Sequence, residues 1–277
     1  MHEGHSQYET SYRITLQQGF MATQSGPMEC LFSIITVVKN DVNGIRSTIE
    51  SIIQQKGCPF EYIVIDGCSN DGTQDVIHEY SKYIDKSISS KDNGVYDAMN
   101  KSLKHANGKW ILFMNSGDTF FANNILKKTS VHAGHRYSSI LYGNCFIKPR
   151  KKPETNWRHV PASDLKKLYK GPCFSHQSAF IPLEYQLNNP YDASLSIAAD
   201  FKFFYNAFKR DSIDFIHLDF PVSVLSSGGL SDVNQVKSVY QWYQSVDHDF
   251  KCRWHYFILL AKTFAKQMIK KIIGYHN

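Results

Sequence analysis

This sequence has no apolar run of the ~18 to 20 residues that a transmembrane helix requires. Its first 26 residues are polar and lack the apolar segment of a secretory signal peptide. The six cysteines follow no C-x-x-C spacing, which argues against a zinc site, and a disulfide framework is not expected in a chain of 277 residues. We therefore expect reduced thiols and a cytoplasmic protein. Residues 1–28 are interpreted as an extension that is disordered or foreign to the natural protein, with Met28 as a plausible native start.

Acidic residues are absent after Asp249, although six Lys or Arg residues follow it. A smaller basic cluster at residues 148–153 is interpreted as a solvated turn. Since no basic stripe runs along the rest of the chain, a nucleic-acid binder is the least favoured class.

Residues 254–273 predict a helix with two faces. Lys262, Lys266 and Lys270 recur on one side. The other side is apolar and holds Phe257, Leu260, Phe264, Met268 and Ile272. A basic helix of this kind suits an anionic membrane surface, where it lies in the interface. Docking of the apolar face on the protein's own core is the alternative, and the pattern favours neither.

The first half of the chain alternates strand and helix patterns with short connections, which implies a parallel sheet. Strands are predicted at 31–38, 62–65, 84–89 and 110–114, and helices at 42–55, 73–83 and 95–106. Polar residues end three of the strands: Asn40, Asp66 and Asp118. In open α/β sheets ligands bind at this edge, and a carboxylate there can hold a hard cation.

The second half gives weaker patterns. A helix is predicted at 120–133, a short helix at 161–169, and strands at 139–143, 145–147, 213–218 and 222–224. Asp200 stands where an aromatic helix begins, so a favourable interaction with the helix dipole explains it as well as catalysis does. His176 alone is more often a structural histidine than a catalytic one.

Three motifs in this order resemble the pattern of glycosyltransferase family 2. They are FSIITVVKN, EYIVIDGCSNDGT and SSKDNGVYDAMNKSLKHANGKWILFMNSGD, with weaker echoes in SHQSAF, IAADFKF and SSGGLS. The resemblance implies an α/β protein of the GT-A fold, with a mostly parallel central sheet flanked by helices and a C-terminal amphipathic helix. The domain is expected at 29–250, with a nucleotide-binding half at about 29–120, an acceptor half at about 121–250, and the helix at 251–277.

The resemblance also implies roles for particular residues. The nucleotide pocket is assigned Thr36, Val38, Asn40, Asp66, Asp92, Asn100, Lys101 and Asn115. Asp118 is the expected ligand of Mg²⁺ or Mn²⁺, because Asn115 replaces the first acid of the family's Asp-x-Asp element and leaves a weaker site or one richer in water. His176 and Gln177 are expected near the diphosphate or the acceptor. Asp200 is the expected general base.

The resemblance further implies an inverting transfer of a sugar from a nucleotide-sugar, most simply a UDP-sugar, to an acceptor hydroxyl. A polyprenyl-diphosphate-linked saccharide in surface polysaccharide synthesis (O-antigen, capsule or exopolysaccharide) is the expected acceptor, with the enzyme peripheral at the inner face of the cell membrane. A sugar-nucleotide nucleotidylyltransferase is the alternative, but it requires a Gly-rich basic loop where this chain has KNDVNGIRS. A non-catalytic nucleotide-sugar-binding protein ranks third, on account of Asn115.

Overall fold

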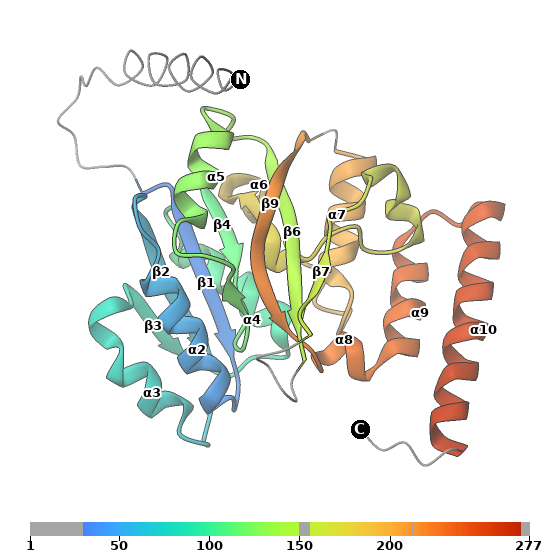
Figure 1. Ribbon diagram of the computed structural model, residues 1–277, viewed down its shortest axis with the longest axis horizontal. Helices are drawn as coiled ribbons and strands as arrows, with labels where there is room; N and C mark the ends of the chain where they lie inside the picture. Colours follow the sequence, from blue (N-terminus) through green and yellow to red (C-terminus); the bar gives the residue numbers. More distant parts are fainter. Residues whose placement is uncertain (1–29, 150–155, 212, 273–277) are drawn as a thin grey trace, which may run out of the picture.

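The computed structural model describes residues 30–149, 156–211 and 213–272. The predicted extension at 1–28 and most of the basic cluster at 148–153 lie outside the described residues. Within them the strands form one curled sheet in the order β3-β2-β1-β4-β8-β6-β9-β5, with β7 paired to β6 (Figure 1). The strands are β1 (Phe32–Val38), β2 (Phe60–Asp66), β3 (Lys86–Ser89), β4 (Trp110–Phe113), β5 (Thr119–Phe120), β6 (Ile140–Lys148), β7 (Arg158–Val160), β8 (Ala179–Pro182) and β9 (Phe215–Ser226).

The α-helices cover the faces of this sheet, and α9 and α10 lie beyond one end of it (Figure 1). They are α2 (Val42–Ile53), α3 (Thr73–Glu79), α4 (Val95–Ser102), α5 (Ile125–Ala133), α6 (Leu183–Asn188), α7 (Ala199–Lys209), α8 (Leu230–Val233), α9 (Gln235–Ser245) and α10 (Phe250–Ile272). Short 3₁₀ turns are η1 (Ser81–Tyr83), η2 (Leu103–His105), η3 (Leu165–Lys170) and η4 (His176–Ser178).

The sheet has a parallel part and a mixed part. β1 pairs in parallel with β2 and β4, and β2 with β3, as the strand and helix alternation predicts. β8 then runs antiparallel to both β4 and β6, while β6 and β9 are parallel. The expected parallel sheet therefore holds for the first half, and the carboxyl ends of β1, β2 and β4 share one edge.

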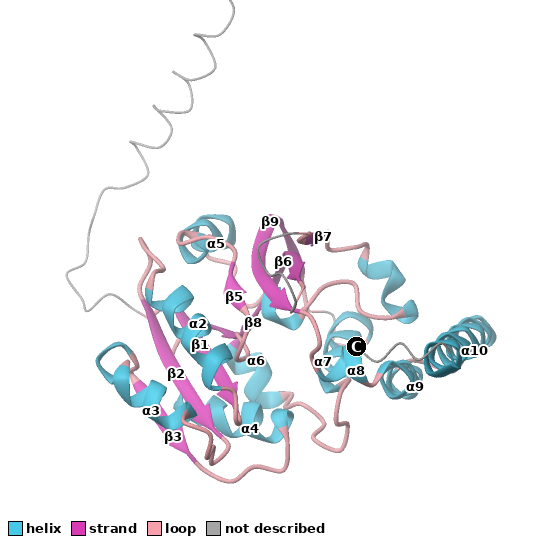
Figure 2. Ribbon diagram, turned by 60° about the horizontal axis from the view of Figure 1, so that its bottom comes forward, coloured by secondary structure: helices cyan, strands magenta, loops and turns pink. Residues whose placement is uncertain are grey.

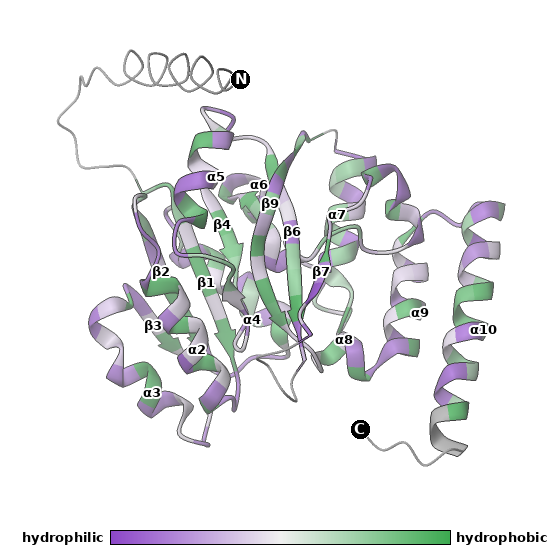
Figure 3. Cartoon of the chain, in the orientation of Figure 1, coloured by the Kyte–Doolittle hydropathy of each residue, from purple (hydrophilic) through white to green (hydrophobic). Residues whose placement is uncertain are grey.

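The parallel strands are buried on both faces because their side chains alternate. Ile34 and Leu112 point into a core closed by α2, α3 and α5. Ile35 and Phe113 point the other way, into a core closed by α4 and α7 (Figure 2). Hydrophobic residues accordingly run through β1 and β4, whereas α2 and α3 carry hydrophilic bands between apolar ones (Figure 3). This explains why the sequence of these strands reads as continuous apolar runs.

Four predictions for the second half were wrong in part. The expected helix at 120–133 begins only at Ile125, because Thr119 and Phe120 pair with β9 instead. The two strands expected on either side of residue 144 form the single strand β6, whose pairing with β9 shifts register there. The strands expected at 213–218 and 222–224 are likewise one strand, β9. The short helix expected at 161–169 is the 3₁₀ helix η3, which begins only at Leu165.

The C-terminal helix α10 packs against α9 at the end of the molecule away from β3 (Figure 1). Cys252 and Tyr256 are buried in this contact, and the Tyr256 ring lies 5.7 Å from that of Tyr243 on α9. The predicted helix is thus confirmed, and its docked face is the one that carries these two residues. Among the described residues, no helix combines the length and the apolar character that crossing a bilayer demands.

Candidate active site

The ends of β1 and β2 are tied together by polar contacts. Asp66 is 2% exposed, and its carboxylate accepts hydrogen bonds from the backbone N–H of Ser69, the Gln74 amide at 3.0 Å and the Ser89 hydroxyl at 2.7 Å. Asn40 holds the left-handed backbone (φ 53°) and accepts from the N–H of Asn70 at 2.9 Å. Two of the predicted nucleotide residues therefore shape one rigid loop pair at the expected edge.

Gly67 lets two further side chains approach that edge. A Cβ at this position would lie 2.4 Å from Oδ2 of Asp92 and 3.2 Å from Cδ of Lys39. Asp92 is fixed in turn because its Oδ1 accepts from the N–H of Gly94 at 2.9 Å. The turn acid thus lies beside the ends of β1 and β2, where the resemblance placed it, together with a lysine that sequence reasoning did not single out.

Three predicted nucleotide residues have internal partners instead. Thr36 is fully buried and accepts from the Tyr62 hydroxyl at 3.1 Å. Asn100 bonds both backbone groups of Tyr191, with its Nδ2 donating to the carbonyl and its Oδ1 accepting from the N–H. Lys101 pairs with Asp97 on its own helix at 2.7 Å. Their side chains therefore have partners within the protein, and their contact with a nucleotide stays a prediction. Val38 is nearly buried, so only its backbone is available there.

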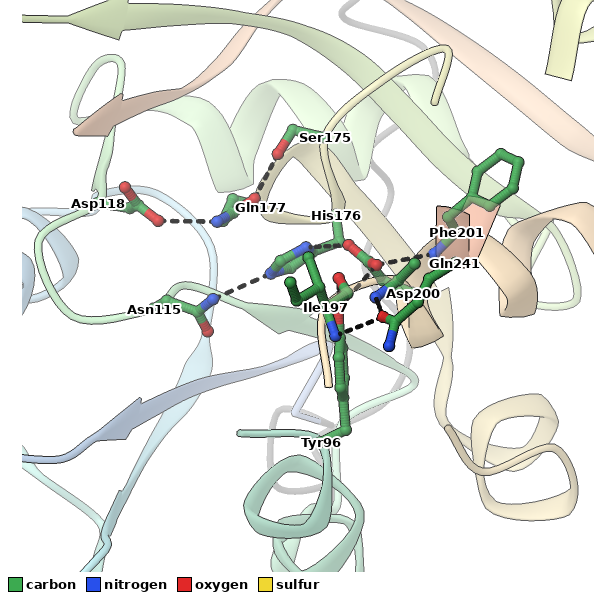
Figure 4. A network of polar contacts seen from close by, with 11 residues as sticks. Tyr96, Asn115, Asp118, Ser175, His176, Gln177, Ile197, Asp200, Phe201 and Gln241 are labelled. Atoms are coloured by element: carbon green, nitrogen blue, oxygen red, sulfur yellow. Dashed lines mark hydrogen bonds and ion pairs between the residues drawn. The ribbon is translucent and has the colours of Figure 1, made fainter. Parts of the chain in front are cut away.

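A chain of hydrogen bonds links the two halves of the protein (Figure 4). Asn115, two residues after the end of β4, lies with its Nδ2 3.1 Å from Nε2 of His176. Nδ1 of the same imidazole lies 2.7 Å from Oδ2 of Asp200, at the start of α7. Because a carboxylate only accepts, Nδ1 carries a proton and donates to it. The structure thus brings together three of the residues that the resemblance singled out.

Tyr96 on α4 completes this chain, and sequence reasoning missed it. Its hydroxyl lies 2.9 Å from Oδ1 of Asp200 and 2.5 Å from the carbonyl of Ile197. Oδ1 also accepts from the N–H of Phe201 at 2.8 Å. Tyr96 lies in the first turn of α4, and the helical spacing of this segment gives no signal of a polar role for it.

The hydrogen bonds decide the ionisation of Asp200. Burial by itself raises the pKa of this carboxyl, but the hydrogen bonds from His176, Tyr96 and Phe201 and the charge of His176 outweigh it, so the pKa lies below its ordinary value. Burial and the adjacent Asp200 charge raise the pKa of Tyr96 well above its usual range. Asp200 is therefore a carboxylate at neutral pH, 23% exposed, beside a neutral phenol that donates to it. A small cavity runs along it, lined by His176, Asp200, Cys173 and Phe174.

Asp118 is held differently. It is 7% exposed, and its two oxygens accept from the Gln177 amide at 2.8 Å and from the N–H of Ser226 at 2.9 Å. Burial raises the pKa of Asp118 to about 6, although both hydrogen bonds lower it. Gln177 is itself fixed by the hydroxyl of Ser175 (Figure 4). Both partners of this acid come from segments far along the chain, so its burial was not readable from the sequence.

The side chains around Asp118 do not provide the set of ligands with which a protein holds a divalent cation. Both Asp118 oxygens already accept hydrogen bonds, and Asn115 stands in place of the first acid. Within the described residues, no group of three His, Cys, Asp or Glu side chains is placed to hold a metal ion. The buried Oδ1 of Asn115, which has no hydrogen-bond partner, could provide only one uncharged metal ligand.

Asp118 leads to a prediction on stability. Because burial raises the pKa of Asp118 in the folded protein to about 6, above the ordinary value of about 3.9, the protonated form is favoured on folding. This contribution to stability is fully present below about pH 4 and is lost as pH rises through about 6. The free energy of unfolding of the wild type, relative to Asp118→Asn, is expected to fall by about 3 kcal/mol between about pH 4 and about pH 7. Denaturant unfolding of both proteins over this range measures it. A difference independent of pH would contradict the burial described here.

Comparison with known proteins identifies the family of this chain. The model of the family described as "Glycosyl transferase family 2" matches residues 33–184. The PGL/p-HBAD biosynthesis glycosyltransferase of Mycobacterium bovis (strain BCG / Pasteur 1173P2) is 27% identical over 208 residues, which cover 73% of this chain and 79% of the relative. The putative teichuronic acid biosynthesis glycosyltransferase TuaG of Bacillus subtilis (strain 168) is 28% identical over 137 residues, or 48% of this chain and 54% of the relative.

Solved structures share the fold at low sequence identity. S. aureus TarS 1-349 in complex with UDP-GlcNAc superposes with a TM-score of 0.57 and 19% identity, over 84% of this chain and 71% of that one. The mannosyltransferase PcManGT from Pyrobaculum calidifontis, in complex with GDP-Man and Mn²⁺, has a TM-score of 0.57 and 14% identity, over 86% and 69%. The match covers 39% of a longer TarS chain. The expected GT-A fold is thus confirmed, and, since the family model spans more than half of the sequence, this chain belongs to glycosyltransferase family 2.

Proposed function

We propose that this glycosyltransferase moves a sugar from a nucleotide-sugar, with UDP-sugars as the first candidates, to a hydroxyl of a lipid-linked saccharide in surface polysaccharide synthesis, with inversion at the anomeric carbon. The observation that carries the proposal is the hydrogen-bonded chain from Asn115 through His176 to Asp200. It joins the nucleotide edge of the parallel sheet to an ionised carboxylate on the acceptor side.

Asp200 is the proposed general base. An acceptor hydroxyl must lose its proton as it attacks the anomeric carbon, and a carboxylate within hydrogen-bond reach takes it up. Its partners hold Asp200 in one orientation, so little reorganisation is needed when the acceptor arrives. A single displacement from the face opposite the diphosphate gives the inverted product.

The nucleotide is proposed to lie over the ends of β1 and β2. Asp66, Asn40 and Asp92 would frame the base and ribose, and Lys39 lies beside them with a positive charge. UDP is favoured because the structurally similar TarS is in complex with UDP-GlcNAc, although PcManGT is in complex with GDP-Man. The Mg²⁺ or Mn²⁺ expected from the resemblance is proposed to accompany the donor's diphosphate, with water among its other ligands, because within the described residues no three His, Cys, Asp or Glu side chains are grouped to hold it.

A donor panel tests this function. UDP-, GDP- and dTDP-sugars are incubated with the full chain and a lipid-linked acceptor extract, with Mn²⁺ or with EDTA, and release of nucleoside diphosphate is measured. Release from one donor, with transfer of its sugar to acceptor, is the expected result. Binding of a donor without turnover under any acceptor condition would favour a non-catalytic nucleotide-sugar-binding protein, and binding of none would reject the proposal.

The exposed side of α10 supports a location at the inner membrane face. Phe250, Trp254, Phe257 and Phe264 are 85%, 58%, 65% and 59% exposed. At 100° per residue they line the side of the helix opposite the buried Cys252. Docking on the protein's core therefore applies only to the opposite face of the helix. Leu260, which the sequence pattern placed on the same face as Phe257 and Phe264, packs partly against the core.

Exposed basic residues also lie on α10, with Arg253 beside the stripe and the lysines turned away from it. Arg253, Lys262 and Lys266 are exposed, and no acid follows Asp249 in the sequence. Aromatic side chains inserted among acyl chains and cations at the headgroups are the two attractions that hold an interfacial helix on anionic lipid. We therefore propose that α10 binds the enzyme to the cytoplasmic leaflet, where a lipid-linked acceptor is presented.

A further inference from the structure

Four aromatic side chains gather on the surface formed by β5, β6 and β7. The rings of Phe121 and Phe146 stack with their centroids 5.1 Å apart and an angle of 12° between their planes. The rings of Trp157 and His159 lie 6.3 Å and 5.0 Å from that of Phe146. These four residues are called the aromatic cluster below. Phe121 directly follows β5, Phe146 lies on β6, and the other two lie on β7 or just before it, so the cluster depends on the sheet pairing.

The aromatic cluster stands apart from the two apolar cores. Phe121 is 41% exposed and Trp157 is 46% exposed, while His159 is also exposed and Phe146 is half-buried. Phe121, Phe146 and Trp157 belong to neither of the cores that cover the faces of the parallel strands. Because exposed apolar residues that gather in one place commonly mark a binding surface, the cluster is a candidate for one.

The aromatic cluster adjoins the candidate active site. β6 and β9 pair Lys148 with Ser226, whose N–H donates to the carboxylate of Asp118. Phe146 stands two residues before Lys148, which is roughly 7 Å along the strand. Since side chains two residues apart on a strand face the same way, Lys148 lies beside the rings, and its charge acts on Asp118. A ligand lying across the rings is therefore close to the side of the site that holds Asp118 and its partner Gln177.

The chemistry of this surface fits a saccharide. The C–H groups on the face of a sugar ring carry partial positive charge, which the negative face of an aromatic ring attracts. The hydroxyls at the rim of the sugar need hydrogen-bond partners, and the imidazole of His159 and the ammonium group of Lys148 provide them. An acyl chain would leave both polar groups without a partner, and the exposed stripe of α10 is the surface proposed for lipid.

The size of the aromatic cluster argues against a second protein chain as its occupant. An aromatic side chain buries about 150–250 Å² when it is fully covered, so the exposed parts of three rings offer only a few hundred Å². A stable interface between proteins buries about 800 Å² on each partner. A small ligand with flat faces fits this area better.

We propose that the aromatic cluster binds the saccharide chain of the acceptor, beyond the sugar whose hydroxyl reacts at Asp200. This inference rests on the proposed function and adds the surface that selects an acceptor with several sugars. The donor's sugar is held at the edge of the sheet by its bond to the diphosphate. An acceptor chain instead extends away from its reactive hydroxyl, and it needs a surface on which to lie. Phe121, Phe146 and Trp157 are then specificity residues that take no part in the chemical step.

Saccharide binding tests the inference separately from catalysis. The full chain is applied to an array of immobilised bacterial surface oligosaccharides, from monosaccharides to longer chains, and the apparent Kd for each is measured. The wild type is expected to bind some of the longer chains and to bind monosaccharides much more weakly. Phe121→Ala combined with Trp157→Ala is expected to bind the same chains about 10- to 100-fold more weakly, because two stacking rings are lost.

Three further variants separate stacking from a general disturbance. Phe121→Tyr combined with Trp157→Phe keeps both rings and is expected to bind within about threefold of the wild type. Phe121→Leu combined with Trp157→Leu keeps apolar side chains without rings and is expected to be about as weak as the alanine variant. Tyr83→Ala combined with Tyr240→Ala removes two rings of similar exposure, 48% and 50%, on η1 and α9, and is expected to bind like the wild type.

Equal binding of the oligosaccharides by the wild type and the alanine variant would overturn the inference, as would a wild type that binds none of them. Self-association that the alanine variant loses, measured by light scattering, would also overturn it and assign the cluster to a second copy of the chain. None of these results affects the proposed function, which the donor panel tests through release of nucleoside diphosphate. If the donor panel fails while the cluster binds oligosaccharides, the proposed function is rejected and the role of the cluster in an acceptor site falls with it.

Discussion

Replacement of Asp200 by asparagine is expected to lower turnover by about 10²- to 10⁴-fold, the range that a positioned general base contributes. The amide is nearly isosteric but cannot take up the acceptor's proton. It also cannot accept from all three donors that surround the carboxylate, which are Tyr96, Phe201 N–H and His176. Steady-state transfer with the donor identified by the panel measures the effect, and the loss is expected in kcat.

Asp192→Asn is the matched control for this substitution. Asp192 lies shortly before α7 and pairs with Lys202 on that helix at 2.7 Å, in a partly exposed ion pair outside the hydrogen-bonded chain of His176 and Asp200. Loss of such a pair contributes little to stability, so turnover is expected within about twofold of the wild type. Nucleotide binding by Asp200→Asn is expected to stay within about tenfold of the wild type, because the base acts on the acceptor hydroxyl. Turnover above a tenth of the wild-type value would exclude Asp200 as the base.

The second large effect is expected on membrane binding. Phe257→Glu combined with Phe264→Glu places two carboxylates in the exposed apolar stripe of α10 without touching its docked face. Each lost aromatic insertion is worth about 1.5 kcal/mol or more, and each new charge is repelled by anionic lipid, so binding to such vesicles is expected to fall by at least about 100-fold. Co-sedimentation with vesicles of phosphatidylglycerol and phosphatidylcholine measures it.

Val131→Glu combined with Leu187→Glu is the control for charge. These exposed residues lie on α5 and α6, away from the stripe, so the same two charges are expected to leave vesicle binding nearly unchanged. Vesicles of pure phosphatidylcholine and high salt are both expected to weaken binding of the wild type, because each removes the attraction between the Lys and Arg side chains of α10 and anionic headgroups. Equal binding of the stripe variant and the wild type would exclude the helix as the contact. Self-association that the stripe variant loses would identify a second copy of the chain as its occupant instead.

The sequence predicted those parts of the fold that depend on local pattern. The apolar runs of β1, β2 and β4 and the helical spacing of α2 and α4 are short-range signals, and the structure confirms them within a few residues. The residues 119 and 120 were assigned to a helix because their pairing with β9 depends on a segment more than 100 residues away. The polar partners of Asp118 are equally remote, since Gln177 and Ser226 stand 59 and 108 residues from it.

The candidate site divides in the same way. Asp66, Asp92 and Asp200 were singled out through motifs, and their roles stay predictions. Asp66 and Asp92 lie where β1 and β2 end, and Asp200 lies in the first turn of α7. Thr36 and Asn100 were assigned from neighbouring motif positions, but the direction of a side chain depends on packing, and both turn towards the protein. The contact between His176 and Asp200 depends on how the turn η4 meets the start of α7, and spacing along the chain carries no sign of it.

The pair formed by His176 and Asp200 also limits how this enzyme can be recombined with its relatives. The segment matched by the family model ends at residue 184, so the imidazole lies inside it and the carboxylate outside. A chimaera joined at that point would combine a histidine and an aspartate that have not been selected together. Asn115 and Tyr96 also lie before the junction, and both contact this pair. Exchange of acceptor specificity by domain grafting therefore calls for a junction beyond Lys209, where α7 ends and the whole chain of contacts is inherited from one parent.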